Sequence, residues 1–135
     1  MASIVTTTIT NGAGQNLVLR FSNGGNPSPT IKNTQTVSFP LAVQANYLNG
    51  ALVYELGSTL KWVLFWTTDN KASTKMFKIS DSIDWKQVAN NLKSGQMSED
   101  MITYGDYEYT AWTSIGPNST GQAVTANINA RPVSI

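Results

Sequence analysis

Hydrophobic side chains occur in short runs along the chain, alternating with polar ones, and Gly, Asn and Pro interrupt these runs. A period of two is typical of β-strands that bury one face, and regular turn signals between such runs favour an antiparallel sandwich. The sequence therefore predicts a mainly β fold, an antiparallel β-sandwich that residues 1–135 form as a single domain. The runs expected to form strands are residues 3–10, 17–22, 30–39, 51–56, 59–67, 75–79, 102–114 and 122–130.

The first two runs are expected to pair as a hairpin, because the Asn-Gly dipeptide at 11–12 between them is a strong turn signal. Alternation in the second run places Leu17, Leu19 and Phe21 on one face. Pro40 is expected to end the third run, since proline cannot donate a hydrogen bond to a strand ladder.

A second hairpin is predicted at residues 51–67, where Gly57 and Ser58 join two runs. The second of these runs carries large side chains on both faces, with Trp62 on one face and Phe65 on the other. Strands with two apolar faces are usually covered on both sides. This strand is therefore predicted to be central in its sheet.

One amphipathic helix is predicted over residues 82–93, where apolar side chains recur at i, i+3, i+4 and i+7. Asp81 or Ser82 is expected to cap its N-terminus, and Gly95 is expected to end it in a left-handed conformation. Trp85, in the first turn, is expected to anchor the helix in the core. The alternative is that its ring borders a groove between helix and sheet.

Composition excludes most common catalytic designs. The 135 residues include no Cys and no His, so the chain can form neither a thiolate or imidazole nucleophile nor a Cys/His zinc site. Nine basic residues against eight acidic ones give a net charge of +1 and no basic stripe, which argues against nucleic acid as a partner. No cofactor is expected. The N-terminal residues show no secretory signal, so a cytoplasmic location or leaderless release is expected.

The acidic residues give little support for an enzyme. Asp106 and Glu108 share a predicted strand face at i, i+2, a spacing that could hold a calcium ion or a pair of glycosidase carboxylates. A solvated strand face is the favoured interpretation, because nothing nearby predicts a desolvated pocket. Two other acidic pairs have a structural interpretation. Asp81 and Asp84 are expected to mark the helix N-terminus, and Glu99 and Asp100 are expected to point apart in a polar loop.

Aromatic residues give the clearest functional signal. Tyr104, Tyr107, Tyr109 and Trp112 fall in one predicted strand, where flat amphipathic rings suit stacking on a sugar or cation–π attraction to a choline headgroup. The alternative is that the face shared by Tyr107, Tyr109 and Ala111 is buried in the core, since aromatic residues are common in strands. Both interpretations stay open.

Several stretches resemble a known superfamily. They are the strand pair at 50–60 with 63–65, the closing hairpin at 116–128, and the tract Phe21-Ser22-Asn23-Gly24. Together with the single helix, they resemble the actinoporin-like cytolysin superfamily, which includes the fungal fruit-body lectins. The resemblance implies a β-sandwich that binds glycans or membrane lipids, with peripheral membrane contact. The aegerolysins match the opening Ile-Thr-Asn-Gly region and Phe65-Trp66 similarly, but they would not supply the helix.

The chain also departs from the cytolysin pattern. It begins in a predicted strand, where actinoporins carry an amphipathic N-terminal helix, and its segment 69–75 lacks the aromatic residues of their membrane-facing loop. Of their headgroup-binding tyrosine cluster, only Trp85 lies opposite a tyrosine, and Ala89 and Asn90 replace others. The resemblance therefore implies recognition at a membrane more than autonomous pore formation.

The sequence thus predicts a non-enzymatic, homo-oligomeric protein that recognises glycans or lipid headgroups at cell surfaces, as a lectin or a cytolysin-like defence protein. One alternative is a pore-forming toxin or a component of a two-part cytolysin, and another is a structural, self-assembling β-protein. Rings are expected to stack on the ligand while polar side chains orient it. The predicted binding residues are Trp85, Tyr104, Tyr107, Tyr109, Trp112, Asp69, Asn70 and Asn23.

Overall fold

The computed structural model describes residues 3–23, 27–43, 49–119 and 121–133. Within these ranges the chain forms ten β-strands, a short α-helix and a 3-10 helix, which confirms the mainly β prediction. No described helix is long and apolar enough to cross a membrane. The elements are β1 (Ser3–Gly12), β2 (Leu17–Ser22), β3 (Thr30–Ile31), β4 (Thr36–Val43), β5 (Asn49–Leu56), β6 (Leu60–Thr67), β7 (Ala72–Lys78), α1 (Trp85–Asn90), η1 (Asn91–Ser94), β8 (Met97–Tyr104), β9 (Tyr107–Asn118) and β10 (Gly121–Pro132).

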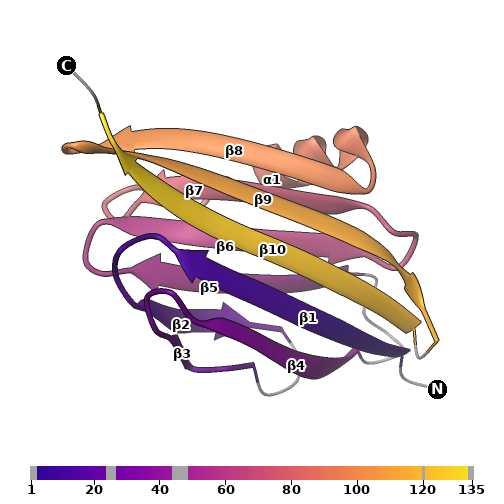
Figure 1. Cartoon of the computed structure of the whole chain (residues 1–135). Helices are drawn as coiled ribbons and strands as arrows, with labels where there is room; N and C mark the ends of the chain where they lie inside the picture. The colour runs from indigo at the N-terminus through magenta and orange to yellow at the C-terminus, as the bar shows by residue number, and fades with distance from the viewer. Residues whose placement is uncertain (1–2, 24–26, 44–48, 120, 134–135) are drawn as a thin grey trace.

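The strands form two five-stranded sheets that pack face to face (Figure 1). The front sheet has the strand order β4-β1-β10-β9-β8, and the back sheet has the order β3-β2-β5-β6-β7. All paired strands are antiparallel except β1 and β10, which run parallel from Ile4 opposite Gly121 to Gly12 opposite Asn129. The β5–β6 hairpin and the interior position of β6 confirm the sequence prediction for residues 51–67.

The main hydrophobic core lies between the two sheets. Trp62 of β6 is fully buried there, and its indole Nε1 donates a 2.7 Å hydrogen bond to Thr74 Oγ1, which in turn donates to the Val63 carbonyl at 3.0 Å. The indole therefore combines a large buried apolar area with a satisfied polar atom. Other large side chains that are fully buried in this core are Ile9, Leu17, Ile31, Leu52, Tyr54, Leu56, Leu60, Leu64 and Ile128.

Tyr54 adds a pH-dependent element to this core. Its hydroxyl donates a 2.8 Å hydrogen bond to the Ser28 carbonyl, and burial raises its pKa above the ordinary value of a tyrosine. The unfolded chain therefore ionises first, so the stability that Tyr54 contributes is complete below about pH 10 and is lost as the pH rises further. Chemical denaturation between pH 8 and 11 should show a falling free energy of unfolding. The fall should be smaller in Tyr54→Phe, and an unchanged slope would contradict this prediction.

The helix covers only part of the outer face of the back sheet. Val88 of α1 packs on Val53 and Val63, which point away from the main core. The helix begins later than predicted, because Asp84 and not Asp81 or Ser82 is its N-cap; Asp84 Oδ1 accepts a 3.1 Å hydrogen bond from the Gln87 amide.

The helical segment also ends as two different pieces. After Asn90 the chain tightens into the 3-10 helix η1, so the predicted helix is confirmed, but its α-helical part spans only Trp85–Asn90 of the predicted 82–93. Gly95 ends η1 with a φ of 86° and a ψ of −127°, so it does not take the predicted left-handed helical conformation, although its positive φ is one that glycine adopts without strain.

Strands β7 and β8 meet where the edges of the two sheets come together. The outward amide of Thr74 donates to Ser98 Oγ at 3.1 Å, and the outward amide of Met76 donates to Asp100 Oδ2 at 2.8 Å. Side-chain oxygens of the front sheet thus satisfy backbone donors at the edge of the back sheet. Glu99 and Asp100 lie in a strand and not in the predicted loop, although they do point to opposite sides.

The opening of the chain differs from the prediction. Strands β1 and β2 belong to different sheets, so they do not form a hairpin, and the Asn-Gly dipeptide at 11–12 ends β1 before the chain crosses to the back sheet. Pro40 lies inside β4, opposite Thr6, and does not end the strand. Proline is tolerated there because β4 is an edge strand, and one side of its backbone needs no ladder donor.

A β-bulge in β2 reverses the predicted direction of Phe21. The register between β2 and β5 shifts between Leu19, which pairs with Tyr54, and Phe21, which pairs with Val53. The extra residue turns Phe21 onto the outer face of the back sheet, away from the face that Leu17 and Leu19 share. The predicted common face for the three side chains is therefore wrong for Phe21.

Residues 102–114, predicted as one strand, contain a hairpin. Gly105 and Asp106 form a two-residue turn between β8 and β9, with Gly105 at a φ of 61°, and Tyr104 pairs directly with Tyr107. Glycine is suited to the first position of such a turn because it has no Cβ to clash. The four aromatic residues of the predicted binding strand therefore come from two strands.

Candidate functional site

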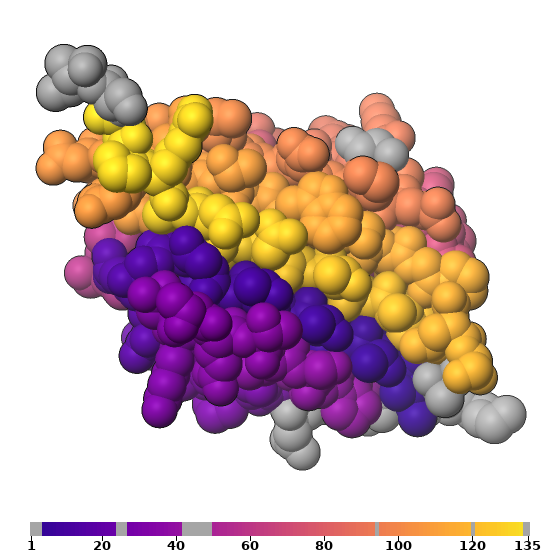
Figure 2. Space-filling view, in the orientation of Figure 1, coloured from indigo at the N-terminus to yellow at the C-terminus, as the bar shows by residue number. Residues whose placement is uncertain are grey.

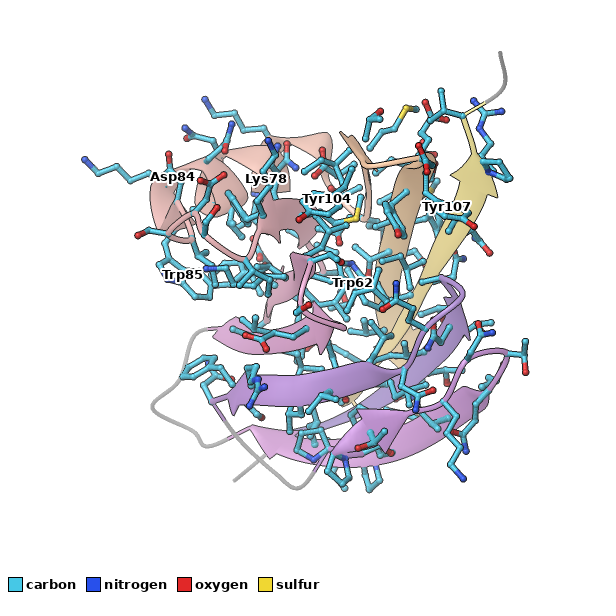
Figure 3. All side chains as sticks on the ribbon, turned by 90° about the vertical axis from the view of Figure 1, so that its left-hand side faces the viewer. Trp62, Lys78, Asp84, Trp85, Tyr104 and Tyr107 are labelled. Carbon is cyan, nitrogen blue, oxygen red and sulfur yellow. The ribbon has the colours of Figure 1, made fainter. Side chains whose placement is uncertain are left out.

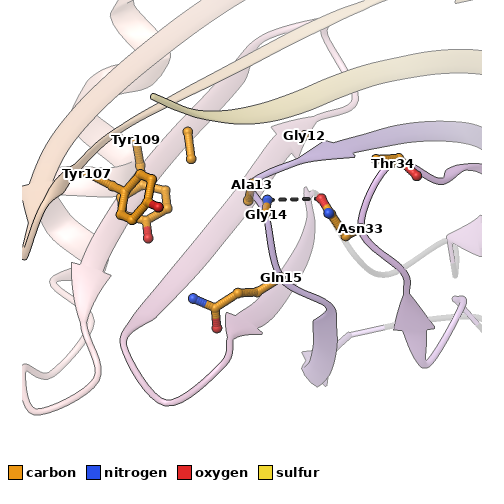
Figure 4. A pocket seen from close by; sticks show the side chains of 9 residues that line it. Gly12, Ala13, Gly14, Gln15, Asn33, Thr34, Tyr107 and Tyr109 are labelled. Carbon is orange, nitrogen blue, oxygen red and sulfur yellow. Dashed lines mark hydrogen bonds between the residues drawn. The ribbon is translucent and has the colours of Figure 1, made fainter. Parts of the chain in front are cut away.

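Two of the predicted binding residues meet in a pocket at the end of the sandwich where β1, β8 and β10 end. Tyr107 and Tyr109 lie with their ring centroids 6.3 Å apart beside the loops that follow β1 and β3 (Figure 4). The cavity has a volume of about 340 Å³. We call it the tyrosine pocket, and it is lined by Gly12, Ala13, Gly14, Gln15, Asn33, Thr34, Tyr107, Tyr109 and Ala130.

Asn11 fixes the two loops that form one side of the tyrosine pocket. This residue is fully buried at the end of β1. Its Nδ2 donates to the Gln15 carbonyl at 2.8 Å and to the Ile31 carbonyl at 3.0 Å, while its Oδ1 accepts from the Ala13 amide at 3.0 Å. One carboxamide therefore joins the loop after β1 to the end of β3, with all its strong hydrogen-bonding capacity used inside the protein.

Further bonds join the same loops at the surface. Asn33 Oδ1 accepts from the Gly14 amide at 2.9 Å, and the Asn33 amide donates to Asn16 Oδ1 at 3.0 Å. Thr34 has a φ of 70°, which is a strained value for a β-branched residue, and its amide donates to the Asn11 carbonyl at 2.8 Å. Strained backbone of this kind persists only where its surroundings hold it, and it is frequent in binding sites.

The two tyrosines differ in exposure. Tyr109 is buried, and this burial, followed by the charge of Tyr107, raises the pKa of its phenol, so the Tyr109 ring is neutral near pH 7. Tyr107 is 46% exposed at the start of β9. The buried face predicted for Tyr107, Tyr109 and Ala111 is therefore correct for Tyr109 and Ala111 but wrong for Tyr107.

The polar side of the tyrosine pocket was missed from the sequence. Gln15, Asn33 and Thr34 carry no charge and no ring. They lie in the loops that follow β1 and β3, which are distant from β9 in the sequence. The run of Asn, Gly and Gln at residues 11–16 was a signal for a structured loop, because such residues adopt turns and bond to nearby backbone.

A second group of aromatic residues lies on the outer face of the back sheet. Trp85 contacts Phe21 at a centroid distance of 6.4 Å and Phe65 at 6.3 Å, and we call these three residues the aromatic cluster. Trp85 is 42% exposed and Phe21 is 46% exposed. The prediction that Trp85 is a core anchor is wrong. The buried residue of α1 is Val88, which packs in the small hydrophobic cluster under the helix, whereas Trp85 lies at the surface. Figure 3 shows Trp85 and Tyr107 on opposite sides of the molecule, with Trp62 between them.

The predicted polar ligands Asp69, Asn70 and Asn23 bond within the protein. Thr67 Oγ1 donates to Asp69, a hydrogen bond that together with nearby Lys71 lowers the pKa of this exposed carboxyl. Asn70 has a φ of 62° and accepts from Gln122 Nε2 at 3.0 Å. Asn23 Oδ1 accepts from the Ala51 amide at 3.0 Å. These contacts shape the β6–β7 turn and the end of β2, and they do not bring the three side chains into either aromatic site.

The remaining aromatic candidates stand apart. Trp112 lies on the outer face of the front sheet, between Asn127 and Glu99 in the register. Figure 2 shows this face, which none of the described helices or strands covers. Tyr104 is 36% exposed and borders a shallow hollow beside Thr59 and Lys78. Neither residue lines the tyrosine pocket or joins the aromatic cluster.

The carboxylate pair considered from the sequence is not formed. Asp106 lies in the turn between β8 and β9, while Glu108 of β9 pairs with Arg131 of β10, at 2.7 Å from Arg131 Nε. The prediction that Asp106 and Glu108 share a strand face is therefore wrong. In the parts of the chain that the structure describes, no three Asp or Glu side chains are grouped so that they could hold a metal ion.

Comparison with known proteins shows that the chain shares its fold with solved structures. No protein-family model matches the chain, and no curated protein matches it either. Among solved structures, the chain is similar to the crystal structure of the lipid binding protein Nakanori, with a TM-score of 0.65 and 19% identity over 96% of this chain and 72% of that one. It is also similar to a variant of the Xerocomus chrysenteron lectin XCL, with a TM-score of 0.53 and 8% identity over 97% and 99% of the two chains. At these identities the similarity is one of fold.

Proposed function

We propose that this protein is a non-enzymatic recognition protein that binds a lipid headgroup or a glycan at a cell surface. The observation that carries the proposal is the aromatic cluster, in which Trp85 and Phe21 are exposed together on one face. Large aromatic side chains that are exposed side by side are unusual on a soluble surface unless they contact a ligand, a partner or a membrane.

The structure around the aromatic cluster suits such contact. Phe65 is partly buried against Val53 and Val63, so the exposed rings of Trp85 and Phe21 rest on a packed base. Arg20, which precedes Phe21 in the chain, pairs with Glu55 at 2.7 Å. Rings presented in this way can stack on a sugar or attract a choline cation, and they need no charged attraction.

The names of the two similar structures support the same class of function. One is described as a lipid binding protein and the other as a lectin, and both names denote binding. The proposal for this chain covers both ligand classes, and the membrane contact it implies is peripheral. Self-association, which would strengthen weak sites through multivalency, stays a prediction for which light scattering is the direct measurement.

The test is binding to vesicles and to glycans. Vesicles of phosphatidylcholine and of phosphatidylserine, used in co-sedimentation, separate a choline headgroup from an anionic one, and a glycan array samples sugars. We expect binding to phosphatidylcholine vesicles or to at least one glycan. Absence of binding to both vesicle types and to every glycan would overturn the proposed function.

Two variants connect the binding to the aromatic cluster. Trp85→Ala removes a ring that packs edge-on against Phe21 and at a tilt against Phe65, and it should weaken binding about tenfold. Trp112→Ala is the matched control, because Trp112 is also partly exposed but lies on the front sheet. It should change the affinity less than twofold. Equal losses in the two variants would contradict the assignment to the cluster.

A further inference from the structure

We infer that the tyrosine pocket is a separate binding site for a neutral saccharide. The site lies at the end of the sandwich, on a different part of the molecule from the aromatic cluster (Figure 3). It does not depend on whether the cluster binds lipid or glycan. Its support comes from its size, the chemistry of its lining and the way its loops are held.

The size of the tyrosine pocket limits its ligand. A volume of about 340 Å³ lies at the small end of the range of about 300–1,000 Å³ that is typical of ligand pockets. A ligand of one or two sugar rings fits such a space. A long acyl chain would instead need an apolar tunnel, and the main core behind Tyr109 is filled with packed side chains.

The lining favours a neutral, hydroxyl-rich ligand. Gln15, Asn33 and Thr34 offer carboxamide and hydroxyl groups, and no charged side chain lines the pocket. Carboxamides and hydroxyls both donate and accept hydrogen bonds, so they match the hydroxyl groups of a sugar. Glu108, which lies between Tyr107 and Tyr109 in the chain, pairs with Arg131 and does not line the pocket.

Two of the lining groups remain available for a ligand. The exposed Gln15 carboxamide and the Tyr107 hydroxyl make no hydrogen bond to the described residues, whereas Asn33 Oδ1 is already bonded to Gly14. In Figure 4 the Tyr107 ring and the Gln15 side chain border the same opening. The ring supplies a stacking face and the carboxamide supplies orientation, which together are the usual elements of a sugar site.

The site is also arranged before any ligand arrives. Asn11 ties the loop after β1 to the end of β3 through three internal hydrogen bonds, and Thr34 is held at a strained φ of 70°. A pocket whose loops are already ordered loses little conformational entropy on binding, so a small ligand can bind measurably.

The experiment is ligand-observed NMR with the full chain and named sugars. The probes are galactose, N-acetylglucosamine, N-acetylgalactosamine and lactose as neutral saccharides, with glucuronic acid as an anionic comparison. We expect saturation transfer to at least one neutral sugar and at least fivefold weaker binding of glucuronic acid. No transfer to any neutral sugar at millimolar concentrations, or equal binding of the acid, would overturn the inference.

Exposed residues provide variants that keep the fold. Tyr107→Ala should raise the Kd of the bound sugar about tenfold, and Gln15→Ala should raise it about fivefold. Tyr104→Ala is the matched control, because Tyr104 pairs with Tyr107 across the same hairpin and is similarly exposed, yet it does not line the pocket. It should change the Kd less than twofold. A loss in Tyr104→Ala equal to that in Tyr107→Ala would overturn the assignment.

The same variants separate this inference from the proposed function. Trp85→Ala should leave sugar binding in the tyrosine pocket within twofold, while Tyr107→Ala should leave vesicle binding within twofold. Loss of sugar binding in Trp85→Ala alone would place the saccharide in the aromatic cluster and overturn the inference. Failure of vesicle binding with intact sugar binding would exclude a lipid ligand for the aromatic cluster and leave the pocket standing.

Discussion

Replacing Asn11 by aspartate should lower the free energy of unfolding by about 3 kcal/mol at neutral pH, although the two side chains have nearly the same shape. The native carboxamide donates to the carbonyls of Gln15 and Ile31 from a fully buried position. A carboxylate has no donor and would place a negative charge beside two carbonyl oxygens. The measurement is urea denaturation followed by tryptophan fluorescence.

The pH dependence of Asn11→Asp identifies the cause. Burial against acceptors should raise the pKa of the introduced carboxyl above its unfolded value of about 3.9. The protonated form can donate again, so the loss of stability should be smallest below about pH 4 and should grow as the pH rises through the folded pKa. A loss that does not depend on pH would contradict this explanation.

Asn16→Asp is the control for that experiment. It makes the same chemical change in the same loop, but the Asn16 side chain is exposed and its Oδ1 only accepts, from the Asn33 amide at 3.0 Å. A carboxylate keeps that role. The stability should therefore change by less than about 0.5 kcal/mol, as for most surface substitutions.

The second large effect is expected at the corner between the two sheets. Asp100→Ala removes the acceptor of the Met76 amide and the partner of Lys75, whose Nζ lies 3.5 Å from Asp100 Oδ1. The free energy of unfolding should fall by about 2 kcal/mol, because a partly buried backbone donor is left without its partner. Thermal and urea denaturation would measure this loss.

The neighbouring residue supplies the comparison. Glu99 lies on the same strand but is exposed on the outer face of the front sheet. Glu99→Ala should therefore change the stability by less than about 0.5 kcal/mol. Similar losses in the two alanine variants would show that Asp100 does not seal the edge of β7.

Sequence patterns predicted the parts of this fold that depend on neighbouring residues. The β5–β6 hairpin follows from alternation on both sides of a short turn, and the position of β6 follows from its two apolar faces. The direction of Phe21 could not be predicted in this way. A single bulged residue, set by pairing with β5, moved every later side chain of β2 to the opposite face.

The candidate site was predicted only in part, because sequence patterns report on neighbouring residues and not on residues that the fold brings together. Tyr107 was marked by its aromatic character, but its partners Gln15 and Asn33 are ordinary loop residues that only the packing of the two sheets brings near β9. Trp85 was assigned to the core because tryptophan usually buries its ring, while α1 is too short to cover the outer face on which it lies. Asp69 and Asn70 were predicted to orient a ligand, but their hydrogen bonds hold the β6–β7 turn itself.

The parallel pairing of β1 with β10 has a consequence for how the chain folds. The back sheet is built from β2, β3, β5, β6 and β7 and can form before the later strands exist, whereas the edge of β1 that pairs with β10 must wait for the end of the chain. Pairing strands so far apart in the chain closes a very long loop, which slows folding. During synthesis on a ribosome, β1 can pair with β4 early, but its other edge stays open for most of the translation time, and a chaperone that recognises open strand edges would meet it first.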